Sequence, residues 1–362
     1  MSEPVVVVGV LYPSAWYGAP DAFAAEVRAL EQVDERMVVE VRAYEESHER
    51  RTARGSEPPA AWPPAPELTA EQRALFDRLE VALAIDIPVD MPALAPNLRW
   101  VQAVGAGTAP LQGAGLAAAG IRLTSNGGAN SIAIAEFAFG RLLAAKKRFA
   151  DLARAQAKQQ WSPVFGGQLA GQTLGLIGYG PINQAVAARA AAFGMTVLAT
   201  RNRSGALPEP PVDQFFGATE LHAMLPRCDA IIAAAPETPA TIGLLDADAF
   251  AAMKPGVFVC NVGRGSLIDE PALIAALQSG QVGSAALDVT AVEPLPSGDL
   301  LWDAPNLVIS SHCATAPDAM FRNLHQLFCA NLRRYLGGEA LQNEVEAGRG
   351  YRDHRLARAR RV

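Results

Sequence analysis

The chain has 362 residues, of which 50% are hydrophobic and 19% charged, and its net charge is −6. The length predicts about two domains, and the composition excludes a disordered chain. Arginines are dispersed except in the tail at 349–361, which we interpret as a solvated terminus, so no basic face indicates a nucleic-acid partner.

The cysteines and the start of the chain indicate in which compartment the protein is expected and whether it binds a metal. Cys228, Cys260, Cys313 and Cys329 are far apart, without the close pairs that metal sites and redox motifs use. We therefore expect no metal, and reduced thiols in a cytoplasmic protein. The first apolar run has no basic segment before it and is too short for a signal sequence or a membrane span, so no membrane association is expected.

The first third of the chain alternates strand and helix patterns. We expect a strand at 5–11, an amphipathic helix at 21–33, a strand at 37–42, a helix at 69–79 and strands at 81–85 and 100–104. This alternation predicts a parallel sheet. The prolines of residues 55–66 argue against helix and strand there and indicate a surface loop or short mobile insertion, with a functional lid as the alternative.

The rest of the chain predicts a second sheet. One long, domain-bridging helix is expected at 132–155, then strands at 174–177, 195–200, 230–234, 257–261, 284–287 and 307–309, and a last helix at 319–336 that packs back on the first domain. The predicted fold class is α/β. A doubly wound parallel (Rossmann) domain is expected at 129–315, and a second, flavodoxin-like domain, discontinuous in sequence, at 1–128 and 316–362.

Residues 173–201 predict a strand, a glycine turn, a helix and a second strand. Gly178 and Gly180 follow the apolar run Leu-Gly-Leu-Ile and leave room for a pyrophosphate at the positive end of the next helix. Asn183 stands where a third small residue normally lets helix and strand pack closely, so a local displacement is expected there. The segment predicts a nicotinamide dinucleotide cofactor.

The end of that second strand bears on which cofactor is bound. Arg201, Asn202 and Arg203 stand where an acidic residue would bind the ribose hydroxyls of NAD. Guanidinium groups there would bind a ribose 2′-phosphate through charge-assisted bonds, so the sequence favours NADP over NAD. The alternative is a solvated arginine pair with no ligand.

Three ionisable residues follow later strands. Arg264, Glu293 and His312 each stand at a turn just beyond an expected strand, which is where doubly wound sheets bind ligands. Reduction of a keto acid needs a cation for the carboxylate, a proton donor that titrates near neutrality, and a carboxylate beside that donor. Arg264, His312 and Glu293 supply these in turn. Each alone is compatible with a structural role, and their joint order indicates a catalytic group.

Over residues 80–351 the chain resembles the D-isomer-specific 2-hydroxyacid dehydrogenases, which include glyoxylate/hydroxypyruvate reductases and phosphoglycerate dehydrogenases. The motifs are Leu-Gly-Leu-Ile-Gly-Tyr-Gly-Pro-Ile, Met-Lys-Pro-Gly-Val-Phe-Val-Cys-Asn-Val-Gly-Arg-Gly-Ser-Leu-Ile-Asp-Glu and Ala-Ala-Leu-Asp-Val-Thr-Ala-Val-Glu-Pro. Glu293 and His312 fall where this family places its catalytic Glu and His. The resemblance implies cofactor contacts at Gly178, Tyr179, Gly180, Pro181, Ile182, Arg201, Asn202, Arg203, Ala235, Pro236, Thr241, Val262, Gly263 and Asp288, and substrate contacts at Val104, Gly105, Ala106 and Gly107.

The resemblance also implies a reaction. Hydride passes between the nicotinamide and C2 of a small 2-keto acid such as glyoxylate or hydroxypyruvate, while His312 donates a proton to the carbonyl oxygen. Glu293 holds the imidazole, and Arg264 fixes the substrate carboxylate. A homodimer paired through the helix from Ile132 is implied as well. Two alternatives stay open: a dinucleotide-binding sensor or corepressor without turnover, and a dehydrogenase of formate or another small anion.

Two features depart from the family pattern. Cys313, Ala314 and Thr315 follow the histidine where many members carry Ile-Gly-Gly, so the substrate shape near the nicotinamide is expected to differ. No local cations mark Cys313 as a thiolate, and we interpret it as a packing residue. Trp16 and Tyr17 follow the first strand and suggest an aromatic wall for a larger keto acid.

Overall fold

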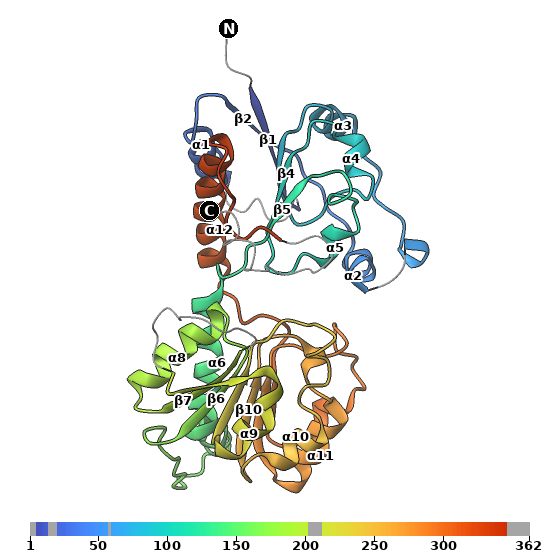
Figure 1. The fold of residues 1–362 in the computed structure, drawn as a ribbon. Helices are drawn as coiled ribbons and strands as arrows, with labels where there is room; N and C mark the ends of the chain where they lie inside the picture. Colours follow the sequence, from blue (N-terminus) through green and yellow to red (C-terminus); the bar gives the residue numbers. More distant parts are fainter. Residues whose placement is uncertain (1–4, 14–19, 57–58, 202–211, 346–362) are drawn as a thin grey trace. The chain divides into compact units, whose positions relative to one another are not determined.

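The structure is a computed structural model that describes residues 5–13, 20–56, 59–201 and 212–345. The chain forms two compact units: unit 1 comprises residues 1–129 and 320–362, and unit 2 comprises residues 130–319. Each unit contains a parallel sheet with helices against it (Figure 1), which confirms the predicted α/β class. Among the residues described, no helix combines the length and apolar character that crossing a bilayer requires.

Unit 1 contains a parallel sheet in the order β2-β1-β3-β4-β5. The strands are β1 (Val6–Leu11), β2 (Met37–Val41), β3 (Val81–Ala84), β4 (Trp100–Ala103) and β5 (Arg122–Thr124). The helices are α1 (Pro20–Glu31), α2 (His48–Ser56), η2 (Pro59–Ala61), α3 (Ala70–Phe76), α4 (Met91–Leu94), α5 (Ala109–Gln112) and α12 (Pro317–Leu336). The strand order reverses between β1 and β3, as it does in flavodoxin, which confirms the predicted class of this domain.

The last helix, α12, belongs to the core of unit 1. Its Leu324, Phe328 and Leu332 are buried together with Val8 of β1 and Trp100 of β4. The rings of Trp100 and Phe328 lie 5.3 Å apart. Unit 1 is therefore built from two stretches of chain that are separated in sequence by unit 2.

Helix α2 was not predicted from the sequence, and it overlaps the proline-rich region. It is held by buried charges: Glu46 accepts a hydrogen bond from Arg54 at 2.7 Å, and Asp86 binds Arg51 at 2.7 and 2.6 Å. The guanidinium of Arg54 also lies 5.7 Å from the ring of Trp62. The expectation that residues 55–66 contain no helix is wrong at 55–56 and 59–61, because tertiary contacts stabilise helices that polar and proline-rich sequence alone does not favour. Residues 57–58 lie outside the described residues.

Unit 2 contains a parallel sheet in the order β12-β11-β10-β9-β6-β7-β8. The strands are β6 (Thr173–Ile177), β7 (Thr196–Arg201), β8 (Gln214–Gly217), β9 (Ala230–Ala233), β10 (Val257–Asn261), β11 (Val282–Leu287) and β12 (Leu307–Ile309). The helices are α6 (Ser131–Lys146), α7 (Phe149–Ala157), α8 (Pro181–Ala192), η3 (Ala218–Glu220), α9 (Leu221–Met224), η4 (Leu225–Arg227), α10 (Ala247–Ala252), η5 (Gly265–Leu267), α11 (Glu270–Ser279) and η6 (Leu300–Asp303). The chain runs outward from β6 to β8, then restarts at β9 on the other side, so the doubly wound prediction is confirmed.

The single helix expected at 132–155 is wrong, because the structure has two helices, α6 and α7. Arg148 between them has a left-handed backbone with φ of 57°. The segment that follows α7 crosses the end of α6: the backbone N–H of Gly167 donates to the carbonyl of Lys146 at 2.9 Å, and Lys147 Nζ donates to the carbonyl of Gly167 at 2.9 Å. The crossing segment thus supplies a hydrogen-bond donor to a backbone carbonyl at the end of α6, which has no partner within the helix.

Candidate active site

Three ionisable side chains follow neighbouring strands of unit 2. Arg264 comes after β10, Glu293 after β11 and His312 after β12, and these strands are adjacent in the sheet. Parallel strands end at the same edge of a sheet, so the structure brings all three residues to one carboxyl edge.

His312 and Glu293 form a hydrogen-bonded pair. Nδ1 of His312 lies 2.8 Å from Oε2 of Glu293. The other carboxylate oxygen of Glu293 accepts from the backbone N–H of Thr290 at 3.1 Å, which fixes the carboxylate plane. Because Nδ1 is engaged and the His312 side chain is 53% exposed, Nε2 is the nitrogen that can reach a ligand.

The pair shifts the pKa of both groups. The hydrogen bond with Glu293 raises the pKa of His312 above its ordinary value, although burial opposes this. Burial is the largest single influence on the pKa of Glu293 and would raise it. The hydrogen bond and charge of His312, the Thr290 N–H and the charge of Arg264 together outweigh burial, so the pKa of this carboxylate is lowered. The positive charge of Arg264 contributes in the same direction at both groups: it lowers the pKa of Glu293 further and offsets part of the rise in the pKa of His312. His312 therefore keeps its proton to a higher pH than a free histidine does.

Asp288 holds the loop that carries His312. The backbone of His312 is left-handed, with φ of 52°, and its N–H donates to the Asp288 carbonyl at 2.8 Å. The Asp288 carboxylate accepts from Ser310 Oγ at 2.7 Å and from the backbone N–H groups of Cys313 and Ala314 at 3.0 Å each. Left-handed backbone is rare for residues other than glycine and persists when surrounding bonds fix it. The sequence did not predict this arrangement, because the bonds join separate strands.

The loop that carries Arg264 touches the turn that carries Glu293. A Cβ added to Gly265 would lie 1.9 Å from the carbonyl carbon of Thr290, so only glycine fits there. Asn261 Nδ2 donates to the carbonyl of Arg264 at 2.8 Å. The two loops are therefore in close backbone contact, and the Asn261 bond fixes the Arg264 side of it.

The turn at Gly178 and Gly180 has the features of a pyrophosphate site. Gly178 has φ of +79°, and a Cβ there would lie 2.9 Å from Cα of Ala235. Gly180 is the N-cap of α8, and a Cβ added to it would meet no atom within 4 Å. Open space in front of the N–H groups of a helix suits a phosphate, so these residues fit a dinucleotide.

Two polar side chains brace this turn. Asn183 is fully buried, and its amide donates to the carbonyls of Ile177 at 3.1 Å and Gly178 at 2.6 Å. Thr200 Oγ1, near the end of β7, accepts from the N–H of Gly178 at 3.0 Å. Hydrogen bonds thus join helix, turn and strand at the position where a third small residue normally packs. Thr200 was not among the predicted site residues.

The other cofactor residues expected from the sequence lie after the same set of strands. Tyr179, Pro181 and Ile182 follow β6, Arg201 ends β7, Ala235, Pro236 and Thr241 follow β9, Val262 and Gly263 follow β10, and Asp288 follows β11. Asn202 and Arg203 lie outside the described residues, as do Trp16 and Tyr17. The switch point of the strand order lies between β6 and β9, which is where ligands of doubly wound sheets bind.

The loop Val104 to Gly107 belongs to unit 1 and follows β4. The Val104 side chain is 2% exposed and its N–H donates to the carbonyl of Ala84 at 3.0 Å, so its side chain is a core residue. The Gly105 carbonyl accepts from the N–H of Asn126 at 2.9 Å, while Ala106 and Gly107 are exposed. The start of the loop is therefore fixed, and its tip is open to a ligand.

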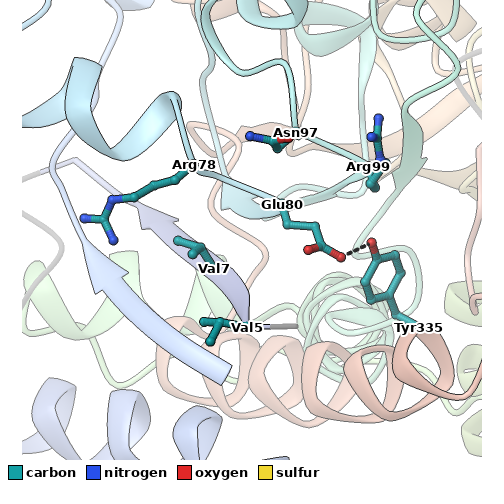
Figure 2. A pocket seen from close by; sticks show the side chains of 7 residues that line it. All are labelled: Val5, Val7, Arg78, Glu80, Asn97, Arg99 and Tyr335. Atoms are coloured by element: carbon teal, nitrogen blue, oxygen red, sulfur yellow. Dashed lines mark hydrogen bonds between the residues drawn. The ribbon is translucent and has the colours of Figure 1, made fainter. Parts of the chain in front are cut away.

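A pocket in unit 1 contains none of the expected site residues (Figure 2). It is lined by Val5, Val7, Arg78, Glu80, Asn97, Arg99 and Tyr335, and Glu80 accepts from the Tyr335 hydroxyl at 2.6 Å. Glu80 and Arg99 immediately precede β3 and β4, so the pocket lies at the amino ends of these strands, away from the ligand-binding edge. In the part of the chain that the structure describes, no cluster of His, Cys, Asp or Glu side chains is arranged for a metal ion.

Comparison with known proteins gives consistent matches. A family model for the NAD binding domain of D-isomer specific 2-hydroxyacid dehydrogenases matches residues 139–314, a range that includes Arg264, Glu293 and His312. A protein named glycerate dehydrogenase from Methylorubrum extorquens is 30% identical over 298 residues, which cover 78% of this chain and 91% of that one. A protein named glyoxylate reductase from Thermofilum pendens is 30% identical over 286 residues, which cover 77% of this chain and 84% of that one.

Other matches extend the comparison. This chain spans 58% of a D-3-phosphoglycerate dehydrogenase from Mycobacterium leprae, so that protein has parts with no counterpart here. A solved D-isomer specific 2-hydroxyacid dehydrogenase from Xanthobacter autotrophicus Py2, in complex with NADPH and MES, is 28% identical with a TM-score of 0.73, covering 96% of this chain and 100% of that one.

Proposed function

The chain belongs to the D-isomer specific 2-hydroxyacid dehydrogenase family, and we propose that it uses NADPH to reduce a small 2-keto acid of the glyoxylate or hydroxypyruvate kind to the D-2-hydroxy acid. Membership makes it an NAD(P)-dependent oxidoreductase of 2-hydroxy acids. The observation that supports the residue roles is the His312–Glu293 hydrogen bond beside Arg264. The names of the glycerate and glyoxylate enzymes support the substrate class.

Each of the three side chains has one task. When bound, the nicotinamide supplies the hydride that adds to C2 of the keto acid. Nε2 of His312 donates a proton to the carbonyl oxygen, and the product is the 2-hydroxy acid. Glu293 keeps the imidazole protonated and oriented until that transfer. Arg264 binds the substrate carboxylate.

The preference for NADPH over NADH is supported by the end of β7. Arg201 is the last residue of this strand and lies about 20 residues beyond the glycine turn, where Rossmann proteins recognise the ribose. Asp213, beside the neighbouring strand, accepts from the N–H of Val197 near the start of β7, away from that end. The relative solved with NADPH supports the same preference. The free thiols of Cys228, Cys260, Cys313 and Cys329 support placing the enzyme in the cytoplasm.

Steady-state rates test the proposed reaction. With glyoxylate or hydroxypyruvate as the substrate, we expect the protein to oxidise NADPH, measured at 340 nm. The kcat/KM for NADPH should exceed the kcat/KM for NADH. Formate oxidation that exceeds the turnover of every keto acid would indicate the formate-type alternative. NADPH binding without turnover on any acid would indicate a sensor or corepressor instead of an enzyme.

The substitution Glu293→Gln is expected to move the pH profile of keto-acid reduction toward acid. His312 must be protonated to act, so the rate falls as pH rises through its pKa, and Glu293 is the main cause of the raised pKa. Without the carboxylate charge the pKa falls, and the falling limb of kcat moves to lower pH. The control is Glu339→Gln, which changes an exposed carboxylate of α12's C-terminal loop and should keep the wild-type midpoint. An unshifted midpoint for Glu293→Gln contradicts the assigned pair.

We also propose a homodimer paired through the α6–α7 region. The apolar side chains there that are exposed are Ile132, Phe149, Leu152, Trp161 and Phe165, with Trp161 103% and Phe165 84% exposed. Apolar patches of this kind mark interfaces, and a stable dimer buries about 1,200–2,000 Å² in total.

The double substitution Trp161→Ser with Phe165→Ser is expected to halve the molar mass measured by light scattering, because both side chains would be buried in the dimer. The control is Trp302→Ser, at a tryptophan that is 52% exposed elsewhere in unit 2. A monomeric wild-type chain at micromolar concentration would refute the dimer.

A further inference from the structure

Tyr179, Phe215 and Arg201 form a row of side chains beside the carboxyl ends of β6 and β7. The guanidinium carbon of Arg201 lies 4.5 Å from the ring centroid of Phe215. Phe215 in turn meets the ring of Tyr179 at 5.1 Å, with an interplanar angle of 76°. Tyr179 belongs to the glycine turn, so the row begins where the cofactor phosphates would bind and ends on the arginine at the end of β7.

The strand register produces this row. Ala199 of β7 pairs with Phe215 of β8, and Arg201 pairs with Gly217. Because side chains alternate along a strand, Ala199 and Arg201 point to the same face as Phe215, and Phe215 packs against the core on the α8 side of the sheet. The hydrogen bond from Gly178 to Thr200 ties the glycine turn to the residue before Arg201. Both ends of the row are thus fixed to the backbone of the sheet.

The row suits recognition of a phosphate by Arg201. A guanidinium stacks on an aromatic ring through its face and binds a phosphate through the N–H groups at its edge, so the two contacts do not compete. A free arginine side chain loses rotamer entropy when it binds a phosphate, and a ring that already holds the guanidinium plane reduces that loss.

We propose that Phe215 is a positioning residue that holds Arg201 for the 2′-phosphate of NADPH and thereby sets the cofactor preference, an inference that rests on the NADPH preference proposed above. Phe215 packs against Arg201 and against the ring of Tyr179, and its effect on the 2′-phosphate reaches the cofactor through Arg201. The 2′-phosphate is the only group in which NADPH differs from NADH, so Phe215 affects NADPH alone.

The test measures the Kd of NADPH and of NADH for the whole protein by cofactor fluorescence. Phe215→Leu is expected to weaken NADPH binding about fivefold, equivalent to ~1 kcal/mol, and to leave NADH binding unchanged. Phe215→Tyr keeps the aromatic face and should restore wild-type NADPH affinity. The matched control is Phe216→Leu, the next residue of β8, which is 6% exposed and lies beneath Arg227 at 5.6 Å. This control should lower the melting temperature without changing the ratio of the two Kd values.

Arg201→Gln separates the inference from the proposed preference. If Arg201→Gln weakens NADPH binding selectively and Phe215→Leu adds nothing in that background, Phe215 acts through Arg201. If Arg201→Gln is selective but Phe215→Leu weakens both cofactors equally or neither, the positioning role is refuted and the preference stands. If Arg201→Gln leaves NADPH binding unchanged, the role of Arg201 is refuted, and the positioning role with it. If the wild-type protein binds NADPH no more tightly than NADH, the NADPH preference itself is refuted.

Discussion

Replacing His312 by Asn is expected to lower kcat for keto-acid reduction by about 10²–10⁴-fold, the range that loss of a positioned general acid produces. His312 is the residue whose Nε2 faces outward while Nδ1 is bonded to Glu293, so no other group in this pair can supply the proton. Asn is the preferred replacement because His312 has φ of 52°, a conformation that Asn tolerates better than Ala. The variant removes the acid without adding backbone strain.

Cofactor binding separates loss of chemistry from loss of structure in this variant. The Kd of NADPH should stay at the wild-type value, because the glycine turn lies after β6 and His312 after β12. The matched control is Cys313→Ser. The Cys313 side chain is exposed, so the packing role expected from the sequence is wrong, and the proposed mechanism does not use this residue. A His312→Asn enzyme that retains more than about a tenth of the wild-type kcat would refute the general-acid role, since even the lower end of the expected loss exceeds that.

The strands that the sequence predicts are mostly apolar runs. Residues 81–85 and 230–234, for example, contain β3 (Val-Ala-Leu-Ala) and β9 (Ala-Ile-Ile-Ala), because strands buried on both faces are rich in Val, Ile, Leu and Ala. The strands that were not predicted, β5 and β8, have the sequences Arg-Leu-Thr and Gln-Phe-Phe-Gly and lie at sheet edges. Short, mixed runs at an edge depend on pairing with a neighbour, which a sequence pattern does not reveal.

Helix boundaries depended on contacts distant in sequence. Lys146, Lys147 and Arg148 all favour helix, so nothing local predicts the break between α6 and α7. The break coincides with the crossing segment, where a Cβ on Gly166 would lie 2.6 Å from the Lys146 carbonyl oxygen. Likewise α2 is too polar for an apolar pattern to mark it, and its partners Glu46 and Asp86 stand outside the helix.

The candidate site, like the fold, could be predicted where a local sequence pattern marks it and not where it depends on contacts distant in sequence. Arg264, Glu293 and His312 could be found because each follows a recognisable strand and because the motifs around them are specific. The clamp formed by Asp288 and the stacking of Phe215 on Arg201 could not, since each depends on which strands become neighbours. Sequence thus predicted the residues for which we propose catalytic roles, whereas the structure was needed for the groups that hold them in place.

The backbone contact at Gly265 links the loop of Arg264 with the turn of Glu293, two residues of the proposed site, and Gly265→Ala is therefore expected to damage catalysis as well as stability. An added Cβ would lie 1.9 Å from the carbonyl carbon of Thr290, 2.0 Å from its oxygen and 2.4 Å from the nitrogen of Ala291. All of these are backbone atoms, so no side chain can rotate away. The loop with Arg264 and the turn before Glu293 must move apart, and kcat/KM for the keto acid should fall at least about tenfold, since misplacements of about 1 Å can cost 10²-fold.

The same variant should lose about 1–3 kcal/mol of unfolding free energy, the usual cost of overpacking a filled site, measured by denaturant unfolding. Gly298→Ala is the matched control, because a Cβ there meets no atom within 4 Å and the residue is exposed. It should keep wild-type stability and rate. A Gly265→Ala enzyme with unchanged kcat/KM would mean that the Arg264 loop and the Glu293 turn can separate without cost, and that substrate binding does not require the contact between them.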